Sequence, residues 1–305
     1  MDALLRLVLA PDRAAASDSL DTWWAATGAR RAAWDASIDR AIAAGALADR
    51  VGFAFAAGYG EALRALVGDR VPDGLHALCA TEESGNHPRA IKTALTPLAG
   101  GGFELTGKKK WATAAPHASA LLVVATTGDG PDGKPRLRVV RVPASAPGVR
   151  LTSSAAPFVP EIPHAEIELD HVRVSADDVL PGDGYDDYLK PFRTVEDLHV
   201  HAALLAYLIG VARVRRFPHE LVEQLLASIV AVRALGLADP RAATTHLALA
   251  GVLAAVHDRL PELERPWAVL ADDEWRRWER DRAILRVASA ARTARRDRAW
   301  EAIGS

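Results

Sequence analysis

The chain has 305 residues, of which 50% are apolar and 25% are charged, and its formal net charge is −2. This composition is typical of a folded globular protein and excludes a disordered chain. The nearly balanced charge argues against a nucleic-acid-binding protein and against attraction to an acidic membrane surface. Cys79 is the only cysteine, which excludes an intrachain disulfide and a zinc site built from cysteines.

The amino-terminal stretch "MDALLRLVLAPDR" has an aspartate where a secretory signal has basic residues, and its apolar run breaks at Pro11. It is therefore not expected to act as a secretory signal. No segment approaches the run of about 20 apolar residues that a membrane-spanning helix needs. The sequence predicts a cytoplasmic protein without a membrane span.

Residues 1–75 are expected to form a helical amino-terminal domain. Trp34, Ile38 and Ile42 recur at four-residue steps, and Gly45 is a suitable end for that helix. In the next stretch, "DRVGFAFAAGYGEALRALVG", one face of a second helix carries Phe55, Tyr59, Leu63 and Leu66.

Two glycines in this second stretch, Gly58 and Gly60, allow two interpretations. A nucleotide-binding glycine loop needs a preceding strand and a third glycine, and neither is present. Close packing against a neighbouring helix is the favoured interpretation, because a residue without a side chain lets another backbone approach.

Residues 76–184 have the pattern of a β domain. Short runs rich in valine and leucine, "SALLVVATT", "PRLRVVRVP" and "AEIELDHVRV", are separated by the turn signals "LAGGGF", "GDGPDGK" and "LPGDGY". The third run alternates apolar and charged residues and slips once at His171, which is typical of a strand with one buried face. A small antiparallel sheet or barrel is predicted.

Residues 185–305 return to helical spacing and predict an antiparallel bundle of four helices. Thr194 and Asp197 have the spacing of a capping box ahead of "LHVHAALLAYLIGVARVRR". Other boundaries are predicted at Pro218 and Gly236 for the second helix, at Asp239 and before Pro261 for the third, and at Asp272 and Asp273 for an arginine-rich last helix. The predicted fold class is α+β with three domains.

Two stretches of the β domain suit neither a core strand nor a surface helix. "LCATEESG" follows an apolar run with Thr81 and two glutamates, and "GFELTGKKKWAT" follows a lysine triplet with Trp111 and Thr113. Together with the later "AEIELDHVRVSADDVLPGDG", these stretches resemble the β domain of the acyl-CoA dehydrogenase superfamily, in a shortened and divergent form. The resemblance implies FAD as the cofactor, with Thr81, Trp111 and Thr113 as contacts of its isoalloxazine ring.

These residues also have simpler interpretations. A tryptophan in a β domain is often a core residue, and a threonine on a strand often only pairs with its neighbours. Lys108, Lys109 and Lys110 are expected to form a solvated strand edge. A flavin ring needs an aromatic wall and hydrogen-bond donors that stabilise its electron-rich reduced form, so the tryptophan and the threonines are the predicted cofactor contacts.

The reaction that the resemblance implies is the α,β-dehydrogenation of an acyl-CoA or a related acyl thioester, in which a carboxylate removes the α-proton. The chain departs from the family here, because no "Tyr-Glu-Gly"-like segment is found and Val200 stands at the family's other base position. Glu196, one helical turn earlier, is the predicted base. As alternatives, Glu196 only complements a helix dipole, and Asp272, Asp273 and Glu274 are either a second candidate group or a helix cap.

Three functions remain open: an FAD-dependent oxidoreductase acting on CH–CH groups, a non-catalytic paralogue that serves as a binding module or partner subunit, and a flavin monooxygenase or oxidase. The resemblance also implies an acyl-CoA or acyl-thioester substrate, a homodimer or higher homo-oligomer with the bundle at the interface, and an electron-acceptor flavoprotein as a partner. No metal site is expected, because the histidines lack metal-ligand spacing and His199 and His201 face different sides of one helix.

Overall fold

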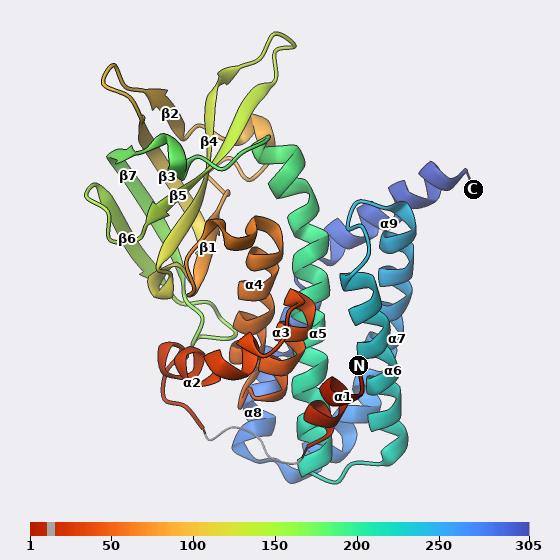
Figure 1. The fold of residues 1–305 in the computed structure, drawn as a ribbon. Helices are drawn as coiled ribbons and strands as arrows, with labels where there is room; N and C mark the ends of the chain where they lie inside the picture. Colours follow the sequence, from red (N-terminus) through yellow and green to blue (C-terminus); the bar gives the residue numbers. More distant parts are fainter. Residues whose placement is uncertain (11–15, 305) are drawn as a thin grey trace. The chain divides into compact units, whose positions relative to one another are not determined.

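A computed structural model describes residues 1–10 and 16–304 and has two compact units (Figure 1). The β unit comprises Leu66–Arg193, and the helical unit comprises Met1–Ala65 together with Thr194–Ser305. The predicted order of helices, β domain and helices is confirmed. Pro11, where the amino-terminal apolar run breaks, lies outside the described residues.

The β unit, all of which the structure describes, contains a seven-stranded sheet. Its strands are β1 (His76–Cys79), β2 (Ala94–Pro97), β3 (Phe103–Thr113), β4 (Ala120–Asp129), β5 (Pro135–Pro143), β6 (Val149–Ser154) and β7 (His164–Val174). The order is β1-β4-β2-β3-β7-β6, and β5 pairs with β4. β1 and β2 run parallel to β4, whereas the other pairings are antiparallel, so the small sheet is mostly of the predicted kind.

The alternation along β7 shows how the sequence forms this sheet. The slip predicted at His171 is real: its φ is 52°, and the buried face changes there by one residue. The residues buried on either side of the slip are Ala165, Ile167, Leu169, Val172 and Val174. They join apolar side chains of the neighbouring strands in one core cluster, so burial on one face drives the sheet to form.

The helical unit begins with α1 (Asp2–Leu9), α2 (Leu20–Ala32), α3 (Ser37–Ala46) and α4 (Val51–Val67). Trp34 lies between α2 and α3, so the predicted helix through Trp34, Ile38 and Ile42 begins only at Ser37. The prediction of close packing at Gly58 is confirmed, because a Cβ atom there would overlap the backbone of Val200.

α5 (Lys190–Val214) continues a π-helical turn formed by Gly184–Leu189. The prediction that Thr194 and Asp197 cap this helix is wrong. The cap is Asp183, whose Oδ1 accepts hydrogen bonds from the backbone N–H groups of Tyr185 and Asp186. An aspartate eleven residues before Thr194 thus satisfies the free amides of the helix start, and Thr194 is left buried inside the helix.

The bundle continues with α6 (His219–Gly236), α7 (Ala243–Leu270), α8 (Asp273–Asp281) and α9 (Ser289–Ile303). The prediction that a helix ends before Pro261 is wrong, because α7 passes through Pro261 and Pro266. Its buried face continues beyond the first proline with Leu263 and Trp267, and this burial outweighs the cost of about 3 kcal/mol for a proline inside a helix.

The predicted last helix is divided in two. Asp272 caps α8 by accepting the backbone N–H of Trp275, as the sequence suggests. A 3₁₀ turn at Arg282–Arg286 and the left-handed Ala288, with φ of 61°, then separate α8 from α9. Further 3₁₀ turns lie at Gly68–Arg70, Pro88–Ala90, Ala115–His117 and Ala176–Asp178.

Among the described residues, one helical stretch, Gly184–Val214, has the length and apolar composition to cross a membrane. The expectation that no segment approaches the apolar run of a membrane-spanning helix is therefore wrong for this stretch. Its most apolar window is 94% buried inside the protein, which is the behaviour of a core helix.

Candidate functional site

Trp111 lies on a β-bulge near the end of β3. Between the pairs Lys109–Ile167 and Ala112–Ala165, β3 advances by three residues while β7 advances by two, so β3 carries one extra residue. Trp111 has a left-handed φ of 58° and is 65% exposed. Such a backbone costs about 1–3 kcal/mol for a non-glycine residue and is typical of functional sites, where bulges re-aim side chains.

Two side chains accompany Trp111 at this end of the sheet. Thr113, the last residue of β3, is half-buried and pairs with His164 of β7. The imidazole of His164 meets the indole of Trp111 edge-on, with ring centres 6.5 Å apart. Burial lowers the pKa of His164, so this ring is neutral near pH 7. The sequence analysis missed His164, although it begins the strand opposite Thr113.

Thr81 lies directly beside the bulge. It follows β1, is half-buried, and its carbonyl oxygen accepts a hydrogen bond of 2.8 Å from the backbone N–H of Lys110. The β unit therefore places the backbone of Thr81 beside the bulge that carries Trp111, although Thr81 lies 30 residues earlier in the chain. An exposed aromatic face at a strand end is an arrangement that can stack on a flat ring.

The prediction of a solvated edge for the lysine triplet is wrong for its central member. β3 lies between β2 and β7 and is not an edge strand. The side chain of Lys109 is completely buried, and its Nζ lies 2.6 Å from Oε1 of Glu82. Burial lowers the pKa of the Lys109 ammonium, and the carboxylate of Glu82 opposes this effect. Lys108 is exposed and Lys110 contacts Glu83, as expected of surface lysines.

Glu82 is the centre of a hydrogen-bonded group beneath Thr81. Its carboxylate accepts the backbone N–H groups of Lys92 at 2.8 Å and Thr93 at 3.0 Å, and the Thr93 hydroxyl at 2.8 Å. Burial alone would raise the pKa of Glu82, but the bonds from Lys109 and Thr93 hold that pKa below its usual value. Glu82 is thus a carboxylate whose oxygens are engaged in holding structure, which argues against a proton-transfer role.

Glu196, the predicted base, belongs to the helical unit. It lies well inside α5 and is half-buried. The alternative interpretation, in which Glu196 complements the dipole of a first helical turn, is therefore wrong. Asp272, in contrast, caps α8 and also forms an ion pair of 2.6 Å with Arg215, so the cap interpretation of that acidic group is confirmed.

The β unit matches a known family. Residues 77–172 match the family described as "Acyl-CoA dehydrogenase, middle domain". A stretch of 114 residues is 33% identical to the probable acyl-CoA dehydrogenase YngJ of Bacillus subtilis (strain 168), and it covers 36% of this chain and 29% of that protein. The β unit thus contains a domain of the acyl-CoA dehydrogenase superfamily.

Solved structures show the superfamily fold over most of the chain. Butyryl-CoA dehydrogenase from Megasphaera elsdenii has a TM-score of 0.63 at 16% identity, covering 86% of this chain and 80% of its own. TdsC from Paenibacillus sp. A11-2, solved with FMN and indole, has a TM-score of 0.69 at 15% identity, covering 98% and 97%. These identities show the fold alone, and the aligned part of YngJ is less than a third of that protein.

Val200 stands where the resemblance to the superfamily places its second base position. Its side chain is buried, and its backbone packs against Gly58 of α4. A carboxylate at this position would be buried at a helix–helix contact, at a large cost in desolvation. Val200 is therefore a packing residue in this chain.

The histidines of α5 are also structural. Nε2 of His199 lies 2.9 Å from the Ser37 hydroxyl, whereas Nδ1 of His201 lies 2.7 Å from the carbonyl oxygen of Asp197. The prediction that the two rings face different surroundings is thus confirmed. Among residues 1–10 and 16–304, no group of three His, Cys, Asp or Glu side chains could hold a metal ion.

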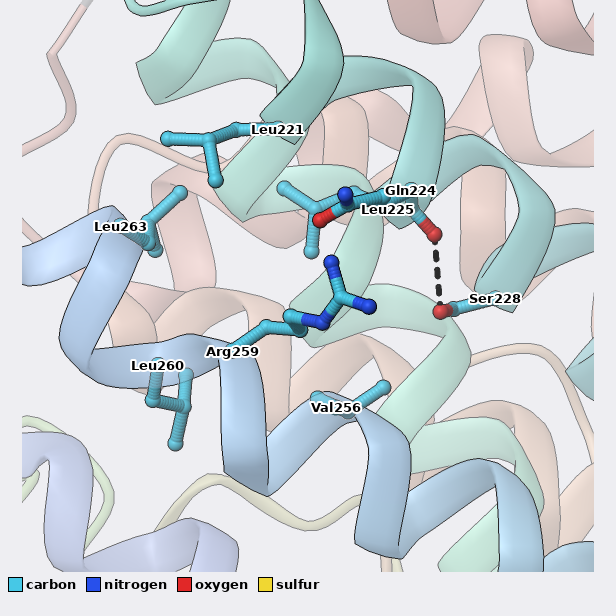
Figure 2. Close-up of a pocket in the computed structure, with 8 residues that line it drawn as sticks. All are labelled: Leu221, Gln224, Leu225, Ser228, Val256, Arg259, Leu260 and Leu263. Carbon is cyan, nitrogen blue, oxygen red and sulfur yellow. Dashed lines mark hydrogen bonds between the residues drawn. The ribbon is translucent and has the colours of Figure 1, made fainter.

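A small apolar recess lies between α6 and α7 (Figure 2). It is lined by Leu221, Gln224, Leu225, Ser228, Val256, Arg259, Leu260 and Leu263. One of its polar groups is engaged with the helix itself, since the Ser228 hydroxyl donates to the carbonyl oxygen of Gln224 at 2.9 Å. No carboxylate or histidine lines the recess, so acid–base chemistry is not expected there.

Proposed function

We propose that this protein is a flavoprotein in which the β unit binds the isoalloxazine ring through Trp111, Thr113 and Thr81. The observation that carries this proposal is Trp111 itself: an indole that is 65% exposed, on a bulge with φ of 58°. A core tryptophan would be buried, whereas this indole is held exposed by a bulge, a feature that often re-aims side chains next to active sites. The match of residues 77–172 to the acyl-CoA dehydrogenase middle domain and the solved neighbours that contain FMN or FAD support a flavin as the ligand.

The residues of the β unit fit the ring end of FAD. The exposed indole offers a flat apolar face, the threonines offer hydroxyl groups, and the bulge interrupts the ladder so that backbone groups become available. When bound, a flavin would accept a hydride from the β-carbon of a substrate. Trp111 would keep water from one face of the ring, and Thr81 and Thr113 would donate hydrogen bonds to its polar edge.

The proposed substrate is an acyl-CoA or a related acyl thioester, and the proposed reaction is its α,β-dehydrogenation. Of the two candidate base positions on α5, Glu196 carries a carboxylate and Val200 carries no titratable group. The Glu196 carboxylate would remove the proton from the α-carbon, which the adjoining thioester carbonyl makes acidic. The expected homo-oligomer, its electron-acceptor flavoprotein and its cytoplasmic location stay predictions.

A second function is favoured by one observation. Val200 is an apolar residue in a tight contact with α4, at a position where part of the superfamily has its base. This supports a non-catalytic paralogue that binds the flavin or an acyl thioester without turnover. The two functions differ in whether a bound acyl-CoA reduces the flavin.

Anaerobic mixing of the flavin-loaded protein with acyl-CoAs of different chain length distinguishes these functions. Dehydrogenation predicts bleaching of the flavin, and Glu196→Gln should slow that bleaching at saturating substrate at least a hundredfold while the flavin stays bound. Glu220→Gln is the matched control, since Glu220 is an exposed glutamate in the first turn of α6, and it should bleach at the unmutated rate. Bleaching of the Glu196→Gln variant at an undiminished rate would remove Glu196 from the mechanism, and a lack of bleaching in the unmutated protein would support the non-catalytic function.

A further inference from the structure

The buried pair Glu82–Lys109 connects the two segments that carry the proposed flavin contacts. Glu82 follows Thr81 directly, and Lys109 lies two residues before Trp111. The bond between Oε1 and Nζ is 2.6 Å long, and Lys109 is completely buried. We propose that Glu82 and Lys109 are a positioning pair that holds the bulge in the conformation that exposes Trp111. This inference rests on the proposed flavin site.

On one side, Glu82 fixes the loop that follows Thr81. Its backbone exchanges two hydrogen bonds of 2.9 Å with Gly85, which closes a tight turn. Its carboxylate then accepts N–H groups from Lys92 and Thr93 at the far end of the same loop. The Glu82 side chain therefore connects the two ends of the loop 82–93. This loop holds the carboxylate in place where it binds the ammonium of Lys109.

On the other side, Lys109 fixes the start of the bulge. It is the last residue of β3 in register with β7, opposite Ile167, before the shift that ends at Ala112. Ala112 is buried in the core. Only Lys110 and Trp111 lie between these two fixed points, and the N–H of Lys110 donates to the Thr81 carbonyl oxygen at 2.8 Å.

The pair is better explained by conformation than by stability. A buried ion pair can often be replaced by apolar groups of similar size without loss of stability, because the attraction between the charges offsets their desolvation only in part. A left-handed backbone at a tryptophan, in contrast, persists only where the surroundings determine it. The ammonium of Lys109 is held by a carboxylate with four hydrogen bonds, which gives the bulge a single anchored geometry.

The test uses the double variant Glu82→Gln/Lys109→Met, which removes both charges and keeps both side-chain lengths. In the place of Oε1, the glutamine carbonyl oxygen can still accept the N–H and hydroxyl groups of Thr93, whereas the bond from the Lys92 N–H to Oε2 is lost. Hydrogen exchange of the free protein reports on residues 81–93 and 108–114, and fluorescence titration with FAD and with FMN reports on the site. We expect at least tenfold faster exchange in these two segments, and at least tenfold weaker flavin binding, with little change in the urea midpoint.

Val142→Ala is the matched control. Val142 is a fully buried residue of β5 that pairs with Leu121 of β4 and lies in the core cluster of the β unit. Its truncation lowers stability through a cavity but leaves the Glu82–Lys109 pair in place. The exchange of residues 108–114 and the flavin affinity should stay within about twofold of the unmutated protein, because substitutions at energetically independent sites affect one another only slightly.

The outcomes separate the positioning role from other roles. Unchanged exchange and unchanged flavin affinity in the double variant would overturn the proposal, and so would equal effects in Val142→Ala, which would make the pair merely structural. If the double variant does not fold, Glu82→Asp replaces it: this variant keeps the charge, draws the carboxylate away from Lys109, and should also speed exchange of the bulge. If the unmutated protein binds no flavin, the proposed function fails, and the exchange of the free protein alone decides the positioning role.

Discussion

Acidification from pH 7 to pH 4 should destabilise the protein through two buried histidines of α5. Burial lowers the pKa of both His199 and His201 from 6.5 to about 4. The folded protein therefore keeps both rings neutral over a pH range in which the unfolded chain protonates them. His201 is the clearer case, because its Nδ1 lies at the Asp197 carbonyl oxygen and its buried Nε2 has no hydrogen-bond partner among the described residues.

The magnitude follows from the size of the pKa shift. A difference of about 2.5 pH units at about 1.4 kcal/mol per unit gives roughly 3 kcal/mol for each histidine. Because the folded pKa is the lower one, stability is fully present above pH 6.5, falls as the pH decreases towards 4, and changes no further below that. Asp197 favours protonation of His201, whereas Arg292 and His257 oppose it, so the carboxylate limits the effect.

Urea unfolding of the unmutated protein and of His201→Met at several pH values between 4 and 7 measures this effect. Methionine has a similar volume and does not titrate, so the variant should lose up to about 1.4 kcal/mol per pH unit from the slope of stability against pH. His219→Gln is the control, because His219 is exposed at the start of α6, and its slope should match the unmutated protein. An unaltered slope in His201→Met would refute the assignment of His201 as a buried neutral ring.

Two further substitutions test the flavin wall and the attachment of α9. Trp111→Ala removes a stacking face of about 80 Å², so flavin binding should weaken by about 2 kcal/mol, or roughly 30-fold, in a fluorescence titration. The control Trp300→Ala, at a half-exposed tryptophan of α9, should bind flavin as tightly as the unmutated protein. If Trp111→Ala also binds flavin as tightly, the ring does not stack on Trp111. Asp197→Asn removes the buried negative charge that pairs with Arg292 and Arg295, so α9 should detach from the bundle. The free energy of unfolding in urea should fall by about 3 kcal/mol, and proteases should cleave faster between α8 and α9. Unchanged cleavage would contradict the role of Asp197 in attaching α9.

The sequence was sufficient where the pattern depends on local burial. The alternation along β7 predicted even the slip at His171, because the polarity of each residue there indicates whether its side chain faces the core or the solvent. The assignment of Trp111 and Thr113 to a flavin wall came from the resemblance of their motif to the acyl-CoA dehydrogenases, and it stays a prediction. The structure adds the bulge and the exposure of the indole, which no residue pattern in β3 indicates.

The sequence was insufficient where a distant partner decides the outcome. In the sequence Lys109 cannot be told from Lys108 and Lys110, and only a carboxylate 27 positions earlier in the chain makes its burial tolerable. Thr194 had the spacing of a helix cap, but Asp183 starts the helix earlier and a helix once started continues. Pro261 had the signature of a helix end, and tertiary burial of Trp267 and its neighbours overrides that local preference.

The most direct test of the flavin proposal is a visible absorption spectrum of the purified protein after incubation with FAD or FMN and removal of free flavin by gel filtration. The proposal predicts a bound flavin spectrum at close to one flavin per chain for at least one of the two cofactors. A folded protein that elutes colourless after both incubations would contradict the proposal.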